Sequence, residues 1–210
     1  MQLKRIWGYY FITDKEMSKA GNASDVKNAV EAGVGIVQYR NKNASIKERY
    51  KEALILKAIC KSSGVYFVIN DHMDVALAVD ADGIHLGQDD MPYAVARKLL
   101  GKDKIIGITV HNVAEALDAE SKGADYIGVS PIFTTNTKSD AGAACGVEMI
   151  AKIKKVCKLP IVAIGGITLD NAAQVIDAGA DSICAISSVV SKENVKAEIG
   201  NFQKLFIASN

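Results

Sequence analysis

Short runs of apolar, largely β-branched residues alternate with longer stretches of helical periodicity along the whole chain. Runs of four or five apolar residues that are bounded by glycine or polar positions are typical of buried strands. Eight such runs predict strands at 9–12, 36–39, 66–69, 83–86, 105–108, 126–129, 161–164 and 182–186. The clearest helical stretches between them are 45–62, 111–121, 146–158 and 168–177. Regular alternation of strand and helix predicts a parallel sheet built from βα units.

Four passages from a helix into the next strand resemble one another, at 31–36, 79–84, 122–127 and 178–183. In each, glycine or another small residue ends the helix, where a positive φ is needed, and an apolar strand follows. The passages precede strands two, four, six and eight, the period expected of an even-numbered barrel. The sequence therefore predicts a single (β/α)₈ TIM-barrel domain over residues 1–210. The alternative, a doubly wound open sheet, usually has fewer strands and an opening GxGxxG, which this sequence lacks.

Composition and charge limit the classes of partner that this protein is expected to bind. Of the 210 residues, 25 are basic and 24 acidic, for a net charge of +1, and no run of five like charges occurs. This balance predicts neither a nucleic-acid nor a membrane partner. The N-terminus runs into a strand-like segment without a signal-peptide pattern, and the four cysteines lack CxxC spacing. We expect a cytoplasmic protein with reduced thiols, in which Cys184 is a core residue of the last strand.

Two cations and an amide follow strand two at alternate positions, as Gln38, Arg40 and Lys42. In a (β/α)₈ barrel the chemistry gathers where strands end, and an extended backbone would point all three side chains into the barrel mouth. Such a set suits a diphosphate, because an arginine can grip two oxygens as a fork. A solvated strand end that pairs with nearby acids explains the spacing equally well.

Carboxylates follow the next two strands, Asp71 after strand three and Asp90 after strand four. Each could instead be the N-cap of a following helix. If both face the mouth, a diphosphate oxygen ~4 Å away would be repelled by about 4 kcal/mol per unit charge at an effective dielectric of about 20. A hard cation between them turns this repulsion into attraction, and Mg²⁺ held by one or two carboxylates plus substrate phosphates is the usual arrangement. The carboxylates therefore predict a magnesium site.

A second phosphate site is predicted on the other side of the mouth. The connection 130–145 is long, polar and without periodicity, as in a lid or binding loop, and its stretch 134–138 carries three threonine hydroxyls and Lys138 that could hold a phosphate. An ordinary polar loop is the alternative. Gly165 and Gly166 end strand seven, and Ser187 and Ser188 end strand eight, where such barrels commonly bind a monophosphate. One phosphate site would therefore hold metal, near strands two to four, and the other would not.

The three histidines give weaker evidence for a functional role than the residues named above. His85 alternates with apolar residues, so a satisfied inward-facing histidine is favoured over a catalytic one. His111 is expected to open a helix together with Asn112, and His72 lies close enough to Asp71 to tune phosphate binding.

Several of these segments, in this order, resemble the thiamine phosphate synthase family over nearly the whole chain. The matching segments are 10–14, 37–42, 69–71, 74–88, 106–109, 111–112, 123–138 and 163–167. The resemblance implies that an aminopyrimidine methyl diphosphate joins a thiazole monophosphate, giving thiamine monophosphate and diphosphate. It implies a dissociative reaction in which the carbon–oxygen bond ionises and the thiazole nitrogen captures the cation.

The resemblance also implies roles for individual residues. Those that would bind the pyrimidine diphosphate are Gln38, Arg40, Lys42, Asn70, Thr109 and Lys138. Among these, Arg40, Lys42 and Lys138 would act in catalysis by stabilising the departing diphosphate, with Mg²⁺ as cofactor on Asp71 and Asp90. Those that would bind the thiazole phosphate are Thr135, Thr137, Gly166, Ile186 and Ser187.

The sequence departs from the family pattern at four places. His72 replaces a usual arginine, Thr134 a common proline, Ser130 a usual glycine and Thr109 a typical serine, although Thr109 keeps the hydroxyl. Related thiazole tautomerases share the barrel but tend to lose the QxRxK lysine and both carboxylates, all of which are present here. A non-catalytic ligand-binding barrel is a further alternative, since fold alone does not fix function. The expected partners are phosphorylated small molecules, and a homodimer is left open.

Overall fold

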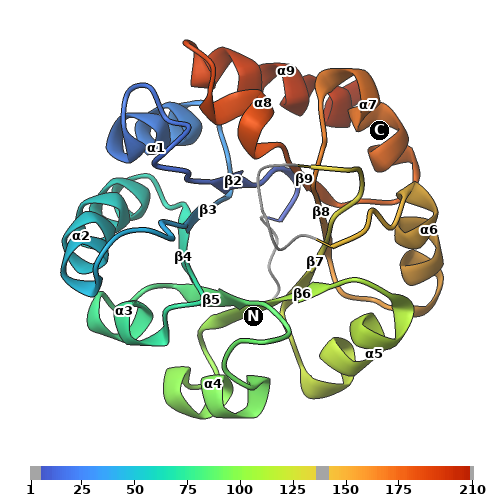
Figure 1. Cartoon of the computed structure of the whole chain (residues 1–210), viewed down its shortest axis with the longest axis horizontal. Helices are drawn as coiled ribbons and strands as arrows, with labels where there is room; N and C mark the ends of the chain where they lie inside the picture. The colour runs from blue at the N-terminus through green and yellow to red at the C-terminus, as the bar shows by residue number, and fades with distance from the viewer. Residues whose placement is uncertain (1–5, 136–141, 209–210) are drawn as a thin grey trace.

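The computed structural model describes residues 6–135 and 142–208, which form a closed parallel barrel (Figure 1). The first strand is divided at Tyr10 into β1 and β2; β1 pairs with the last strand and β2 with β3, so the sheet closes on itself. In chain order the strands are β1 (Gly8–Tyr9), β2 (Phe11–Ile12), β3 (Ile36–Tyr39), β4 (Tyr66–Asn70), β5 (Gly83–Leu86), β6 (Ile105–Val110), β7 (Tyr126–Val129), β8 (Ile161–Ile164) and β9 (Ser182–Cys184). The predicted (β/α)₈ barrel is confirmed.

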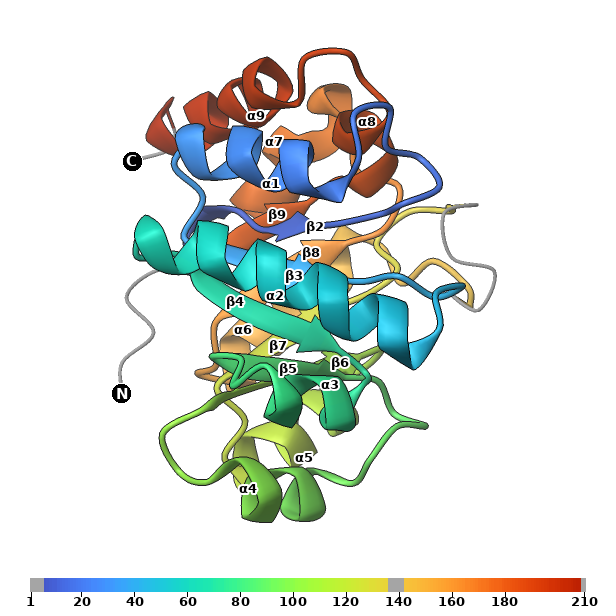
Figure 2. The ribbon, with the colours of Figure 1, turned by 90° about the vertical axis from the view of Figure 1, so that its left-hand side faces the viewer.

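A ring of helices covers the outside of the sheet, and Figure 2 shows α1 and α2 lying along it. The helices are α1 (Asn22–Glu31), α2 (Ile46–Ser62), α3 (Met73–Ala78), α4 (Tyr93–Leu100), α5 (Val113–Lys122), α6 (Val147–Val156), α7 (Leu169–Asp177), α8 (Ile186–Val190) and α9 (Val195–Ala208). The N-cap of α2 is Ser45, whose Oγ accepts from the N–H of Glu48 while the Glu48 carboxylate accepts from the Ser45 N–H. None of the described helices is long and apolar enough to span a membrane.

Several predicted boundaries differ from the structure by one or two residues, and two of these differences concern candidate site segments. The last strand ends at Cys184 rather than residue 186, because Ile186 already begins α8. The helix predicted from residue 111 begins at Val113, and Asn112 is its N-cap, with its side-chain oxygen accepting from the N–H of Glu115 at 2.9 Å. The prediction that Cys184 lies in the core is confirmed, since it is 1% exposed.

The internal repeat has a physical basis at the amino ends of the strands. In three passages an aspartate exchanges two hydrogen bonds with one residue of the preceding strand: its N–H donates to that residue's carbonyl, and its Oδ2 accepts from that residue's N–H. The pairs, with both distances, are Asp82–Phe67 (2.9 and 2.8 Å), Asp125–Ile106 (2.9 and 2.8 Å) and Asp181–Ile161 (3.0 and 2.8 Å). In the fourth passage the residue directly before the strand is Gly35, which has no carboxylate. Its carbonyl accepts a hydrogen bond from the N–H of Tyr66 on the following strand. The carboxylate thus satisfies a backbone donor where a strand begins.

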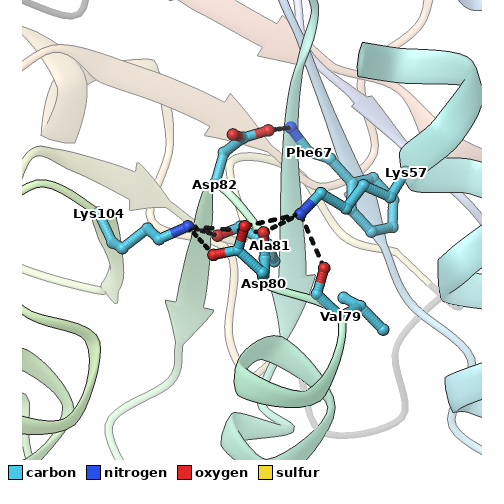
Figure 3. A network of polar contacts seen from close by, with 7 residues as sticks. All are labelled: Lys57, Phe67, Val79, Asp80, Ala81, Asp82 and Lys104. Atoms are coloured by element: carbon cyan, nitrogen blue, oxygen red, sulfur yellow. Dashed lines mark hydrogen bonds and ion pairs between the residues drawn. The ribbon is translucent and has the colours of Figure 1, made fainter.

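Figure 3 shows one such passage together with a neighbouring ion-pair cluster at Asp80. The Nζ of Lys104 lies 2.5 Å from Oδ1 of Asp80, and the Nζ of Lys57 lies 3.3 Å from Oδ2. The hydrogen bond from Lys104, followed by that from Lys57, lowers the pKa of Asp80 below its ordinary value of 3.8. Lys57 also donates to the carbonyl of Val79, where α3 ends. The cluster braces the amino-terminal end of the barrel, opposite the strand ends where the site is predicted.

Candidate functional site

The carboxyl ends of β3 to β7 surround an open cavity of about 780 Å³. Predicted site residues from four different strand ends line it together: Arg40, Lys42, Asn70, Asp71, Asp90 and Thr109. The predicted convergence of two cations and two carboxylates at one rim is therefore present in the structure.

Arg40 is held by the end of the first strand. Its Nη1 lies 3.1 Å from Oδ2 of Asp14 in an ion pair that is largely buried. The Oγ1 of Thr13 accepts from the Arg40 N–H at 2.9 Å and donates to the Arg40 carbonyl at 3.0 Å. The guanidinium has five donors in a fixed fork, so the pair with Asp14 orients it while Arg40 still lines the cavity. The sequence pattern gives Thr13 and Asp14 no role, because their contact with Arg40 arises only when the two strands pair.

The loop that carries Lys42 is fixed from α2. Arg49 donates from Nε to the carbonyl of Asn41 at 2.8 Å and from Nη2 to the carbonyl of Lys42 at 2.7 Å. One turn further along, the Oε2 of Glu52 accepts from the Tyr39 hydroxyl at 2.7 Å and from Nδ2 of Asn41 at 3.2 Å. Side chains three apart on a helix lie on one face, so both reach the same loop.

Neither Asp71 nor Asp90 is an N-cap: the N-cap residues of α3 and α4 are His72 and Pro92. Asp71 has a φ of 62°, a left-handed conformation that aspartate tolerates better than most residues and that often marks a functional position. The Oδ2 of Asp90 accepts from the N–H of Gly87 at 2.6 Å, which fixes its carboxylate. Burial, and secondly the Arg49 charge, lowers the pKa of His72, which favours the neutral ring beside these carboxylates.

The carboxylates of Asp71 and Asp90 suit a magnesium ion that also binds substrate, rather than a metal ion whose ligands all come from the protein. Within residues 6–135 and 142–208 no three or more His, Cys, Asp or Glu side chains gather as a metal site. Two half-buried carboxylates open instead onto one cavity with Arg40 and Lys42. Mg²⁺ is commonly bound by one or two carboxylates and completes its shell with water and substrate phosphates.

A second cavity of about 350 Å³ lies at the ends of β8 and β9. Among its lining residues are Thr135, Gly166, Ile186 and Ser187, all predicted for the second phosphate site. Gly166 has a φ of 63°, and a Cβ there would lie 2.7 Å from the carbonyl oxygen of Thr134, so only glycine fits without a shift. Ser130 lines both cavities, which therefore adjoin. Thr137 and Lys138 lie outside the described residues.

Comparison with known proteins decides the family. A family model described as thiamine monophosphate synthase matches residues 9–189. The chain belongs to this family. It is 54% identical over 194 residues to a thiamine-phosphate synthase of Methanosarcina barkeri, covering 92% of this chain and 88% of the relative. It is 47% identical to that of Chloroflexus aurantiacus, covering 91% and 88%. Among solved structures it is similar to a thiamine phosphate pyrophosphorylase from Pyrococcus furiosus, with a TM-score of 0.89, 39% identity and 98% coverage of both chains.

Gln38 occupies a different place from the other predicted thiamine monophosphate synthase residues. It points inward as expected, but it is 1% exposed, it is not among the residues that line either cavity, and its Nε2 donates to the hydroxyl of Tyr10 at 3.0 Å. Its direct contact with a diphosphate stays a prediction.

The barrel interior also holds polar residues that the sequence pattern did not reveal. The hydroxyls of Tyr10 and Tyr126 lie 2.7 Å apart, and Tyr126 in turn contacts His85. Both tyrosines stand within the apolar runs that predicted strands at 9–12 and 126–129, and the pattern gave their hydroxyls no role. His85 is inward-facing with partners on both ring nitrogens, as predicted, and it also borders the larger cavity.

Proposed function

We propose that this protein joins an aminopyrimidine methyl diphosphate to a thiazole monophosphate, forming thiamine monophosphate and releasing diphosphate, with Mg²⁺ as cofactor. The observation that carries the proposal is that Arg40, Lys42, Asp71 and Asp90 line one cavity beside a second, glycine-rich cavity. Curated relatives between 42% and 54% identical bear the name of this synthase, which supports the same chemistry here.

The larger cavity would bind the diphosphate. Breaking its bond to the methylene carbon leaves negative charge on the departing oxygens and positive charge on the pyrimidine. Arg40, preoriented by Asp14, and Lys42, on the loop held by Arg49, would stabilise that leaving charge. Magnesium on Asp71 and Asp90 would supply further neutralisation of the same oxygens. Asn70 and Thr109 would orient the substrate, and Lys138 is proposed to add a third cation.

The smaller cavity would bind the thiazole phosphate. Gly166 lets the backbone approach the ligand closely, and Thr135 and Ser187 offer hydroxyls on the same lining. Thr137 and Ile186 complete the proposed set. Because the two cavities adjoin at Ser130, the thiazole nitrogen would stand next to the cationic carbon and capture it before water does.

The direct experiment incubates the purified protein with both precursors, with and without Mg²⁺, and measures thiamine monophosphate. We expect Mg²⁺-dependent product. Asp71→Ala and Asp90→Ala should each lower turnover by orders of magnitude with an unchanged circular dichroism spectrum. Asp103→Ala, which removes an exposed carboxylate before β6, is the matched control and should retain the parent rate.

Three outcomes would contradict the proposal in different ways. Parent-like rates in excess chelator would refute the role proposed for Mg²⁺. Isomerisation of the thiazole phosphate without coupling would favour a tautomerase. Binding of both phosphates without turnover would favour a non-catalytic barrel. A cytoplasmic location is also proposed, since the four cysteines, all in the described segments, form no disulfide.

A further inference from the structure

We infer that a buried chain of polar side chains, running from Gln38 through Tyr10, Tyr126 and His85, holds Thr109 so that its hydroxyl donates a hydrogen bond into the larger cavity. Tyr10 and Tyr126 are then positioning residues that act through Thr109. The catalytic consequence rests on the proposed function, whereas the direction of the hydrogen bonds does not.

The chain is continuous in the structure. Nε2 of Gln38 lies 3.0 Å from the Tyr10 hydroxyl, which lies 2.7 Å from the Tyr126 hydroxyl. Nδ1 of His85 lies 2.9 Å from the Tyr126 hydroxyl, and its Nε2 lies 2.8 Å from Oγ1 of Thr109. The first four residues are between 0% and 4% exposed, so water does not compete for these bonds. Of these five hydrogen-bonded side chains, only Thr109 is half-exposed, and it lies at the larger cavity.

Two glycines make room for the chain. Gly107 pairs in register with His85 on one side and Tyr126 on the other. A Cβ on Gly107 would lie 2.0 Å from Cζ of Tyr126, so the tyrosine ring occupies the space over the glycine and reaches His85, with ring centroids 5.5 Å apart. A Cβ on Gly128 would lie 3.1 Å from Cε1 of His85. Glycine at Gly107 on β6 and at Gly128 on β7 therefore leaves the space in which the rings of Tyr126 and His85 meet.

The direction of the bonds follows from which atoms can donate. The amide nitrogen of Gln38 only donates, so the Tyr10 oxygen accepts, and the buried Tyr10 hydroxyl donates its own O–H to its other partner, the Tyr126 oxygen. Tyr126 then donates to Nδ1 of His85, which leaves the ring proton on Nε2, facing Thr109. Burial raises the pKa of both tyrosines, so each keeps the proton that it donates.

The last bond fixes the role of Thr109. Because Oγ1 accepts from His85, the threonine's own proton is directed elsewhere, and Thr109 lines the larger cavity. The site thus offers a neutral donor to an acceptor atom of the substrate, either a diphosphate oxygen or a pyrimidine ring nitrogen. A reversed chain, with the Gln38 amide turned over, would make Thr109 an acceptor instead.

The decisive measurement is the ¹⁵N NMR spectrum of the ligand-free protein labelled at histidine, because the shifts of the ring nitrogens separate protonated from unprotonated nitrogen. The His85 signals are assigned by their loss in His85→Asn. We expect a protonated Nε2 and an unprotonated Nδ1 at neutral pH. Tyr126→Phe should abolish this single tautomer. Tyr9→Phe, which removes an equally buried hydroxyl bonded to Ala185, should leave it unchanged. A protonated Nδ1 in the parent protein overturns the inference, whether or not either variant folds.

Kinetics test whether the tyrosines act through Thr109. Tyr126→Phe should lower kcat/KM about ten-fold in the parent, but less than about two-fold in a Thr109→Val background, since the hydroxyl that it positions is already gone. Thr109→Ser should retain most of the activity. Equal losses in both backgrounds would refute the positioning role. A parent that makes no product would count against the proposed function, and the NMR result would stand apart from it.

Discussion

The buried ion pair between Asp14 and Arg40 gives the most quantitative prediction. Asp14→Asn removes the negative charge and places an amide donor opposite the guanidinium, while one oxygen remains for the N–H groups of Glu16 and Met17. The side chains of Arg40 and Asp14 are 7% and 10% exposed, so the charge left behind is poorly hydrated. Losing one partner of such a pair costs roughly 3–5 kcal/mol. Because Arg40 borders an open cavity, we expect about 3 kcal/mol, a large share of a total stability of about 5–15 kcal/mol.

For a chain of this length that loss corresponds to a fall in Tm of about 6–12 °C, measurable by scanning calorimetry. The control is Glu193→Gln, which breaks an exposed pair with Lys19 whose side chains are 84% and 54% exposed, and which should cost less than about 0.5 kcal/mol. Adding Mg²⁺ and diphosphate should narrow the gap for Asp14→Asn, because a bound anion gives Arg40 a new partner. A fall in Tm no larger than that of the control would refute the reasoning.

Three further predictions follow from individual contacts. Gly107→Ala places a Cβ 2.0 Å from the Tyr126 ring and should lower the free energy of unfolding in urea by about 1–3 kcal/mol. The control Gly200→Ala, on α9 where an added Cβ meets open space, should raise the free energy of unfolding by up to about 1 kcal/mol. If both substitutions changed this free energy in the same direction, the packing of Tyr126 over Gly107 would be contradicted. Arg49→Ala frees the β3–α2 loop and should lower kcat/KM about ten-fold or more in steady-state assays; unchanged kinetics would remove its positioning role. Asp80→Asn should cost under about 1 kcal/mol at pH 7. Since the folded pKa of Asp80 lies below 3.8, this loss should shrink below pH 3.8 and vanish as the pH falls through the lower folded pKa; a pH-independent difference would count against the ion pairs in Figure 3.

The barrel and its rim could be predicted from local pattern. Apolar runs separated by helical periodicity define parallel βα units, and in such a barrel polar residues that follow strands must meet at one end. That rule brought Arg40, Lys42, Asp71 and Asp90 to one cavity although they are up to 50 residues apart in the chain. The Ala-Asp passages were visible as a repeat, but their exchange of two hydrogen bonds with the preceding strand was not.

The supporting contacts could not be predicted, because they depend on pairings across the barrel. Asp14 meets Arg40 only because β2 lies beside β3. Tyr10 and Tyr126 looked like strand-core residues, since periodicity reports which side chains are inward and not which inward hydroxyls meet. The nearest signal was Gly107 inside a strand pattern, because such a glycine often marks a close approach by another group. The N-cap interpretation of Asp71 was wrong because the chain turns through a left-handed residue before α3 begins.

The central claim is that Asp71 and Asp90 share a magnesium ion with the diphosphate at the rim occupied by Arg40 and Lys42. Crystals grown with diphosphate and Mn²⁺ in place of Mg²⁺ would locate the metal by anomalous scattering. The account predicts one peak bonded to oxygens of Asp71, Asp90 and the diphosphate, with Arg40 contacting the same anion. A metal bound away from both carboxylates, or a diphosphate bound away from Arg40, would contradict it.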